Sequence, residues 1–205
     1  MGSDEIRILG GLLIFIVGVG FTPVVELLKD RYNRKKLLQN LNEEFKDEIE
    51  YLKGSISAMA SSIQTIEGLL KGQEQTYGPL TYIPFVSNFV FVEEVIKSNY
   101  RHLKKQQRRD LKAIPKHVKA MEINLEELAR LKTQDENLET KVELSKNYIL
   151  IACSMRELMT KFLLCSEKSE LSYDQYIDKQ LSEVGVTCLK CDDLKQKRKI
   201  QIKQR

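Results

Sequence analysis

The sequence predicts an all-α protein: an N-terminal single transmembrane helix followed by an elongated antiparallel helical bundle of three long helices and one short helix. Residues 8–25 form eighteen consecutive positions without a charge, which suits one membrane span. Three later segments carry apolar residues spaced by threes and fours, the period of amphipathic helices. The whole chain has 30% charged and 42% hydrophobic residues with four prolines, a composition that favours a folded helical body over a disordered one.

The membrane span is expected to cover residues 8–28. Eighteen residues at about 1.5 Å each give roughly 27 Å, slightly short of a hydrocarbon core of ~30 Å. The flank over residues 1–7 contains Asp4 and Glu5 and lacks the basic character of a signal peptide. We therefore expect an uncleaved anchor, with residues 1–7 as a short non-cytoplasmic N-terminus.

The charges that flank the span predict its orientation. Five bases follow it closely, namely Lys29, Arg31, Arg34, Lys35 and Lys36. Only Arg7 precedes it, so the N-terminus should lie outside and the body on the cytoplasmic or an equivalent reducing side. Four cysteines without a plausible pairing framework agree with a reducing compartment. The five bases are also candidate membrane-surface residues.

Two glycines are candidates for association between spans. Gly11 and Gly18 are seven positions apart and share one helix face, where a second backbone could approach closely. The strict G-x-x-x-G pattern is absent from the span, and glycine is common in membrane helices without any such role.

The first long helix of the body follows from an unbroken apolar stripe. Its members are Leu38, Leu41, Phe45, Ile49, Leu52, Ile56, Met59, Ile63, Ile66 and Leu70. This spacing predicts one helix that ends near Gly72. Apart from Gly54 and Gly68, nothing after Glu26 indicates a break, so the helix could continue directly from the membrane span.

The second long helix is predicted from another stripe. It reads Leu111, Ile114, Val118, Met121, Leu125 and Leu128. The pattern extends back through Leu103 and Tyr100 toward Phe89. Pro115 lies inside it and either kinks one long helix or occupies the first turn of a new one, and the unbroken spacing favours the kink.

The third long helix and a short fourth one complete the body. The third stripe, spaced like a coiled-coil seam, reads Leu144, Tyr148, Ile151, Met155, Leu158, Phe162 and Cys165. Ser172 and Gln175 form a capping-box pattern that opens a short helix ending before Gly185. Narrow stripes can be buried only against one another, which predicts a bundle over residues 29–184 and a basic tail over residues 185–205.

The connection between the first two long helices is unusually apolar. Residues 77–92 contain two prolines and five aromatic residues, namely Tyr77, Tyr82, Phe85, Phe89 and Phe91. We expect this connection at the tip of the bundle far from the membrane. Its aromatic residues would cover the end of the core, bind a partner, or dip into a bilayer, and we favour the first role.

Charge is distributed in blocks. Residues 101–119 contain eight bases against Asp110 alone, whereas residues 122–143 contain seven acids against three bases. Such runs usually mark a solvated helix face, and the functional alternatives are contacts with anionic lipid or with nucleic acid. A net charge of +4 and the lack of any recognition motif argue against nucleic acid.

The sequence offers little for catalysis. Cys188 and Cys191 have the spacing of half a zinc site, but no second pair follows. Phosphate-binding, nucleophile-elbow, zincin and di-iron motifs are absent from the sequence. We therefore expect no catalytic residues, no cofactor, no metal and no enzymatic activity.

Two functions from different classes fit these expectations. The favoured one is a single-pass membrane-anchored interaction protein, such as an adaptor, scaffold or assembly factor, with a protein partner or a second copy of itself. The alternative is an oligomerising membrane-acting effector, of toxin or immune type, that perturbs the bilayer through its glycine-containing span.

Overall fold

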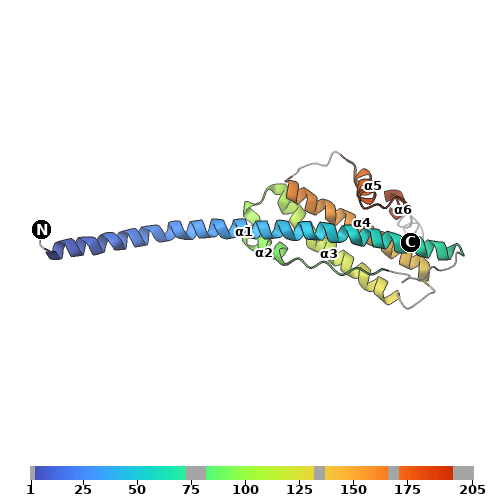
Figure 1. Ribbon diagram of the computed structural model, residues 1–205, viewed down its shortest axis with the longest axis horizontal. Helices are drawn as coiled ribbons and strands as arrows, with labels where there is room; N and C mark the ends of the chain where they lie inside the picture. Colours follow the sequence, from blue (N-terminus) through green and yellow to red (C-terminus); the bar gives the residue numbers. More distant parts are fainter. Residues whose placement is uncertain (1–2, 73–81, 132–136, 166–170, 196–205) are drawn as a thin grey trace, which may run out of the picture.

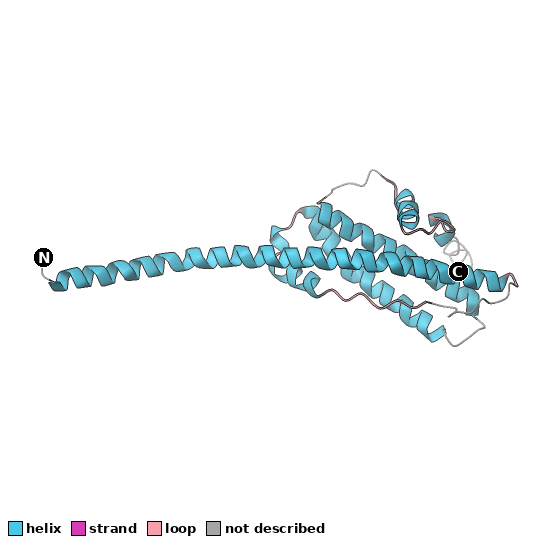
Figure 2. Ribbon diagram, in the orientation of Figure 1, coloured by secondary structure: helices cyan, strands magenta, loops and turns pink. Residues whose placement is uncertain are grey.

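The computed structural model describes residues 3–72, 82–131, 137–165 and 171–195, and these residues form helices joined by loops, with no strand among them. Side chains at positions 3–10, 12–14, 16 and 17 lie outside this description. The elements are α1 (Ser3–Leu70), α2 (Val90–Ser98), the 3-10 helix η1 (Tyr100–His102), α3 (Lys105–Leu131), α4 (Leu138–Leu164), α5 (Tyr173–Glu183) and α6 (Cys191–Lys195) (Figure 2). The predicted all-α class and the helical bundle are confirmed.

Helix α1 is one continuous element of 68 residues. Its C-terminal half lies in the bundle, and its N-terminal part projects alone beyond it (Figure 1). The predicted stripe lies on the buried face, where Leu41, Phe45 and Ile56 are fully covered. The helix ends at Leu70, and Gly72 follows with a φ of +80°, a conformation that favours glycine. This confirms the end expected near Gly72.

The projecting part of α1 has no described segment packed against it, and residues 18–28 are all exposed. Among the side chains that the structure describes, no helix provides a stretch long and apolar enough to cross a membrane. Of the span expected over residues 8–28, eight side chains (8–10, 12–14, 16 and 17) lie outside the described set.

Helix α4 is the centre of the bundle. It packs against both α1 and α3 and runs antiparallel to them (Figure 1). Lys146 near its start forms an ion pair of 2.9 Å with Glu67 near the end of α1. Phe162 near its end lies against Phe45, with ring centroids 5.2 Å apart. These two contacts fix the opposite directions of α1 and α4.

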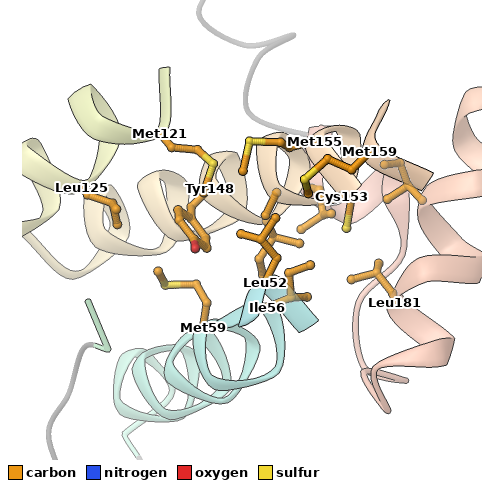
Figure 3. Close-up of a cluster of buried hydrophobic side chains, with 14 of the residues drawn as sticks. Leu52, Ile56, Met59, Met121, Leu125, Tyr148, Cys153, Met155, Met159 and Leu181 are labelled. Atoms are coloured by element: carbon orange, nitrogen blue, oxygen red, sulfur yellow. The ribbon is translucent and has the colours of Figure 1, made fainter. Parts of the chain in front are cut away.

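Helix α4 is buried on more faces than its predicted stripe includes. Tyr148 and Met155 of the stripe are buried, but Leu158 is half-buried and Cys165 is exposed. Further buried residues lie outside the stripe. They are Cys153 and Met159 (Figure 3), together with Ile149 and Ala152. A helix with neighbours on several sides needs apolar residues on several sides, which a single coiled-coil-like seam does not supply.

The first two long helices run parallel, so the predicted antiparallel order holds only for α4. The described part of the connection lies along the side of the bundle. Residues 82–89, which we call the strap, are extended and run back along α1 before α2 begins. At one end the Tyr82 N–H donates to Ser62 Oγ at 3.0 Å, and beyond the strap the Asn99 side chain donates to the Arg34 carbonyl at 3.1 Å. Helix α3 therefore begins at the end of the bundle where α1 enters it.

Helix α3 confirms the second apolar stripe, with Leu111, Ile114 and Met121 buried. It continues through Pro115 without interruption. The pattern that extends back toward Phe89 is not part of the same helix. It forms α2 and η1, which are separated from α3 by a corner at Leu103 and residue 104.

The C-terminal helices cover one side of α4. Helix α5 opens with the predicted capping box of Ser172 and Gln175 and ends before Gly185, which has a φ of +77°. Core packing continues through Val186 and Leu194, past position 184, where we expected the bundle to end and the tail to follow from position 185. The last ten residues of that tail, 196–205, lie outside the described residues.

Candidate interaction surfaces

Polar side chains of α1 hold the strap in place. The Tyr51 hydroxyl accepts a hydrogen bond from the Phe85 N–H at 2.7 Å and lies 3.2 Å from the Phe85 carbonyl, to which it donates. The Ser87 hydroxyl donates to the Glu48 carboxylate. An extended segment has no partner strand here, so these side chains supply hydrogen bonds that a sheet or helix would otherwise provide.

A carboxylate of α1 also caps helix α2. Phe89 at the N-cap position makes no side-chain cap, and Glu44 supplies it instead. Its Oε1 accepts from the Val90 N–H at 2.6 Å, and its Oε2 accepts from the Phe91 N–H at 3.2 Å. A negative charge at a helix N-terminus also interacts favourably with the helix dipole. Glu44 therefore fixes the point where the strap becomes α2.

The residues that hold the strap share one face of α1. Glu44, Glu48 and Tyr51 follow the spacing of that face, beside the apolar stripe. Burial raises the pKa of the Glu44 and Glu48 carboxyl groups above the ordinary value of 4.5. These three residues could not be recognised from the sequence, because polar positions next to a stripe are the ordinary signature of a solvated helix face.

The predicted aromatic surface separates into two parts. Phe89 and Phe91 are half-buried against the core, and the Phe89 ring meets Phe45 edge-on with centroids 5.9 Å apart. Tyr82 is half-buried as well, and Tyr77 lies outside the described residues. Of the four aromatic residues of this surface that the structure describes, only Phe85 is largely exposed, with 84% of its surface accessible. In the described part of the connection, Phe89 and Phe91 thus pack on the side of the core, while Phe85 faces outward.

Two further exposed apolar residues lie close to Phe85 in sequence. Val86 is 42% exposed and Val90 is 64% exposed on the same segment. We call Phe85, Val86 and Val90 the strap patch.

A separate hollow of about 400 Å³ lies between the strap and α3. Its apolar lining includes Phe89, Val92, Ile114, Pro115 and Val118.

The basic segment of α1 is exposed except at Arg34. Lys29, Arg31, Lys35 and Lys36 all face away from the bundle. Arg34 is half-buried, and its Nη1 lies 2.8 Å from His102 Nε2. The Nε of Arg101 donates to the same imidazole nitrogen at 3.1 Å.

His102 serves as the acceptor between these two arginines. Partial desolvation lowers the pKa of His102, and the charges of Arg34 and Arg101 lower it further. A neutral imidazole is therefore favoured, and this is the form that can accept hydrogen bonds from both guanidinium groups.

The fold brings the second basic segment to the same place. Arg101, Lys104 and Lys105 are exposed at the corner where η1 meets α3. This corner adjoins Arg34 through His102, although the two segments are far apart in sequence. An antiparallel second helix would have put these bases at the opposite end of the bundle, so their proximity to residues 29–36 was not predictable from the sequence.

The two candidate glycines lie on the projecting part of α1. A Cβ built on Gly11 or Gly18 would meet no atom within 4 Å in the part of the chain that the structure describes. Neither glycine is needed for packing within those residues. Close approach through them would involve another molecule.

The cysteine pair does not form a metal site with other described residues. Across the described ranges, no group of three His, Cys, Asp or Glu side chains is placed to hold a metal ion. Cys188 is exposed, while Cys191 is buried with its Sγ 3.6 Å from an Asp174 oxygen. Burial raises the pKa of the Cys191 thiol and raises the pKa of Cys153 to about 12. Both buried thiols are therefore poorly reactive at neutral pH.

No protein-family model, curated protein or solved structure matches this chain. Its function must therefore be inferred from its own surfaces.

Proposed function

We propose that this chain is a single-pass membrane-anchored interaction protein, acting as an adaptor, scaffold or assembly factor. In this proposal the N-terminal part of α1 crosses the bilayer and the bundle stands on the cytoplasmic or an equivalent reducing side. The observation that carries it is the part of α1 that projects beyond the bundle and contains the exposed residues 18–28, which we call the arm. Its described large apolar side chains are between 49% and 68% exposed, namely Phe15, Val19, Phe21, Val24, Val25, Leu27 and Leu28.

Such an arm is unfavourable in water. Each Å² of apolar surface removed from water gains roughly 25 cal/mol, and contiguous exposed apolar surface usually marks a site that another molecule or a membrane covers. The uncharged run over residues 8–25 suits the hydrocarbon core of a bilayer. The five bases from Lys29 to Lys36 support an orientation with the body on the side that retains positive charge.

The strap patch supports the interaction role. Phe85 is a large aromatic side chain held outward by a backbone that Tyr51 fixes on both sides of the residue. Rigid exposed aromatic residues are typical anchors of protein interfaces, because they bury large area at a small cost in conformational entropy. A protein partner or a second copy of this chain would cover the patch.

The test is recovery of partners from the native membrane by crosslinking, purification and mass spectrometry. We expect Phe85→Ser to lower partner recovery severalfold at an unchanged melting temperature. Ile123→Ser is the matched control, because Ile123 is 55% exposed on α3 and lies outside the strap patch. Equal recovery with Phe85→Ser, Ile123→Ser and the unmodified chain would remove the strap patch as the binding surface.

The alternative function, an effector that oligomerises through its span, gives a different result. Gly11 and Gly18 are both open to a second helix. Overexpression of an effector would collapse the membrane potential, and Gly11→Leu with Gly18→Leu would abolish that effect. Overexpression of an adaptor would be tolerated. A collapse that depends on the two glycines would therefore reverse the assignment.

A further inference from the structure

Two basic segments meet where α1 enters the bundle. The contacts that join them are the Arg34–His102 approach of 2.8 Å and the hydrogen bond of 3.1 Å from Asn99 to the Arg34 carbonyl. Around this junction lie seven exposed bases, which we call the basic collar: Lys29, Arg31, Lys35, Lys36, Arg101, Lys104 and Lys105. The collar surrounds the point from which the projecting arm leaves.

Two acids, Asp30 and Glu94, lie beside the seven bases of the collar and compensate their charge only in part. Asp30 is the one acid within residues 29–36 and 101–109. Its Oδ2 lies 3.9 Å from Arg34 Nη2, and the Asp30 side chain is 66% exposed. Exposed pairs of this kind contribute little, so the collar keeps most of its positive potential.

Charge of the opposite sign gathers at the other end of the bundle. The C-terminal part of α3 and the N-terminal part of α4 lie together there, as shown by the hydrogen bond of 3.0 Å from Asn124 to the Leu144 carbonyl. Exposed or half-buried acids in this region include Glu122, Glu126, Glu127 and Glu143. The bundle is therefore polarised along the axis of α1, with its positive end toward the arm.

The collar is close enough to a bilayer surface to interact with it. If the span ends at Leu28, a rise of about 1.5 Å per residue places Arg34 about 9 Å beyond it along the helix axis. The Debye length at physiological ionic strength is about 8 Å, so charges at the level of Arg34 remain only partly screened from the headgroups.

We infer that the basic collar is a contact surface for anionic lipid headgroups, which holds the bundle close to the membrane with its acidic end pointing away. This inference rests on the proposed anchoring and names the ligand of the surface beside the anchor. Lipid is favoured over nucleic acid because the collar encircles the arm, next to the proposed span, instead of forming a groove that could follow a nucleic-acid backbone.

The collar should recognise charge and not the identity of a headgroup. The hollow beside it, of about 350 Å³, is lined by Arg34 and Arg101 but also by Asp30 and Glu94. Its charges balance, so it does not form a dedicated phosphate pocket. The uncompensated bases lie around the hollow on the exposed surface, where they act as a diffuse positive field.

A single tryptophan can report the position of the collar, because the sequence contains none. We would place it by S98W, since Ser98 is exposed at the end of α2 beside the collar. The full chain would be reconstituted into phosphatidylcholine vesicles with a dansyl-labelled headgroup lipid. Vesicles with about one quarter phosphatidylserine or phosphatidylglycerol provide the anionic surface.

We expect energy transfer from S98W to rise with either anionic lipid equally and to fall again at about 0.5 M salt. Energy transfer from a second reporter, I123W on the acidic half of α3, should change little when anionic lipid is added. The triple variant R101Q/K104Q/K105Q should abolish the rise, since each base near the surface changes the docked-to-undocked ratio by about fivefold. The control triple K116Q/K119Q/R130Q removes the same charge farther along α3 and should keep the rise.

Several results would overturn the inference. The first is energy transfer from S98W that does not increase when anionic lipid is added. The second is an equal change of energy transfer in the two triple variants. The third is a strong preference between phosphatidylserine and phosphatidylglycerol. Binding of an oligonucleotide that is sensitive to R101Q/K104Q/K105Q, without any lipid response, would assign the collar to nucleic acid instead.

Flotation separates failure of the anchor from failure of the collar. A chain that does not float with phosphatidylcholine vesicles contradicts the anchor. In that case the inference that the collar binds anionic lipid still holds if the chain floats with anionic vesicles and if salt or R101Q/K104Q/K105Q abolishes this flotation. The inference is wrong if the chain does not float with anionic vesicles or if neither change affects its flotation.

Discussion

Phe45 is the residue at which three parts of the bundle meet. It is fully buried on α1, and its ring lies edge-on to Phe89 at the end of the strap and to Phe162 on α4. Edge-to-face aromatic pairs contribute about 0.5–1.5 kcal/mol beyond the burial of their area. Phe45 therefore joins the docking of the strap to the packing of α1 against α4.

Truncation of this residue should be costly. We expect Phe45→Ala to lower the free energy of unfolding by about 3–5 kcal/mol, because it leaves a cavity among three packed segments. Phe85→Ala is the control, and its 84% exposed ring should change stability by about 0.5 kcal/mol or less. Urea denaturation of both variants measures this. Similar losses for the two would mean that Phe45 is not a core residue.

The pKa of Glu48 predicts a pH dependence of stability. Burial raises the folded-state pKa of this carboxyl group, so the native chain takes up the proton before the unfolded chain does. Its contribution is fully present below the unfolded pKa and is lost as pH rises through the folded pKa. The unmodified chain should therefore gain stability relative to Glu48→Gln as pH falls from about 8 to about 4. A relative loss on acidification would contradict this sign.

Burial of single residues was predictable where periodicity defined it. Leu41, Leu111 and Tyr148 are buried as their stripes indicate. The roles of Glu44 and Glu48 were not predictable, because nothing in the sequence says which segment comes to lie beside a polar position.

Among the elements, the strap determines how the helices are ordered. It runs from the level of Ser62 toward the level of Glu44, so α3 starts beside the point where α1 enters the bundle. Periodicity gives the length of a helix and the face it buries, but not the path of the segment that follows it. Both α1 and the stripe of α3 were therefore predictable, while their parallel arrangement was not.

The attachment of the strap can be tested at Tyr51. We expect Tyr51→Phe to destabilise the protein by about 1 kcal/mol, because the Phe85 N–H and carbonyl lose their partner. Amide hydrogen exchange at Phe85 should accelerate. Tyr32→Phe is the matched control, since Tyr32 is 66% exposed on the projecting side of α1. Unchanged exchange at Phe85 would show that the tyrosine does not hold the strap.

At the scale of the whole molecule, the two ends of the bundle differ in charge and in surroundings. The end with the collar adjoins the apolar arm, and the acidic end lies farthest from it (Figure 1). The charge blocks were visible in the sequence. Their alignment with α1 was not, because it depends on the parallel arrangement of α1 and α3.

The most direct test of the account is the topology of the full chain in its own membrane. Ser3→Cys provides a reporter before the span, and the exposed Cys165 and Cys188 are native reporters on the body. The unmodified chain, which lacks the first reporter, is the control. We predict that the protein resists carbonate extraction and that an impermeant thiol reagent labels only the Ser3→Cys position in intact cells or organelles. Extraction by carbonate, or labelling of Cys165 or Cys188 before permeabilisation, would contradict the proposed anchor and its orientation.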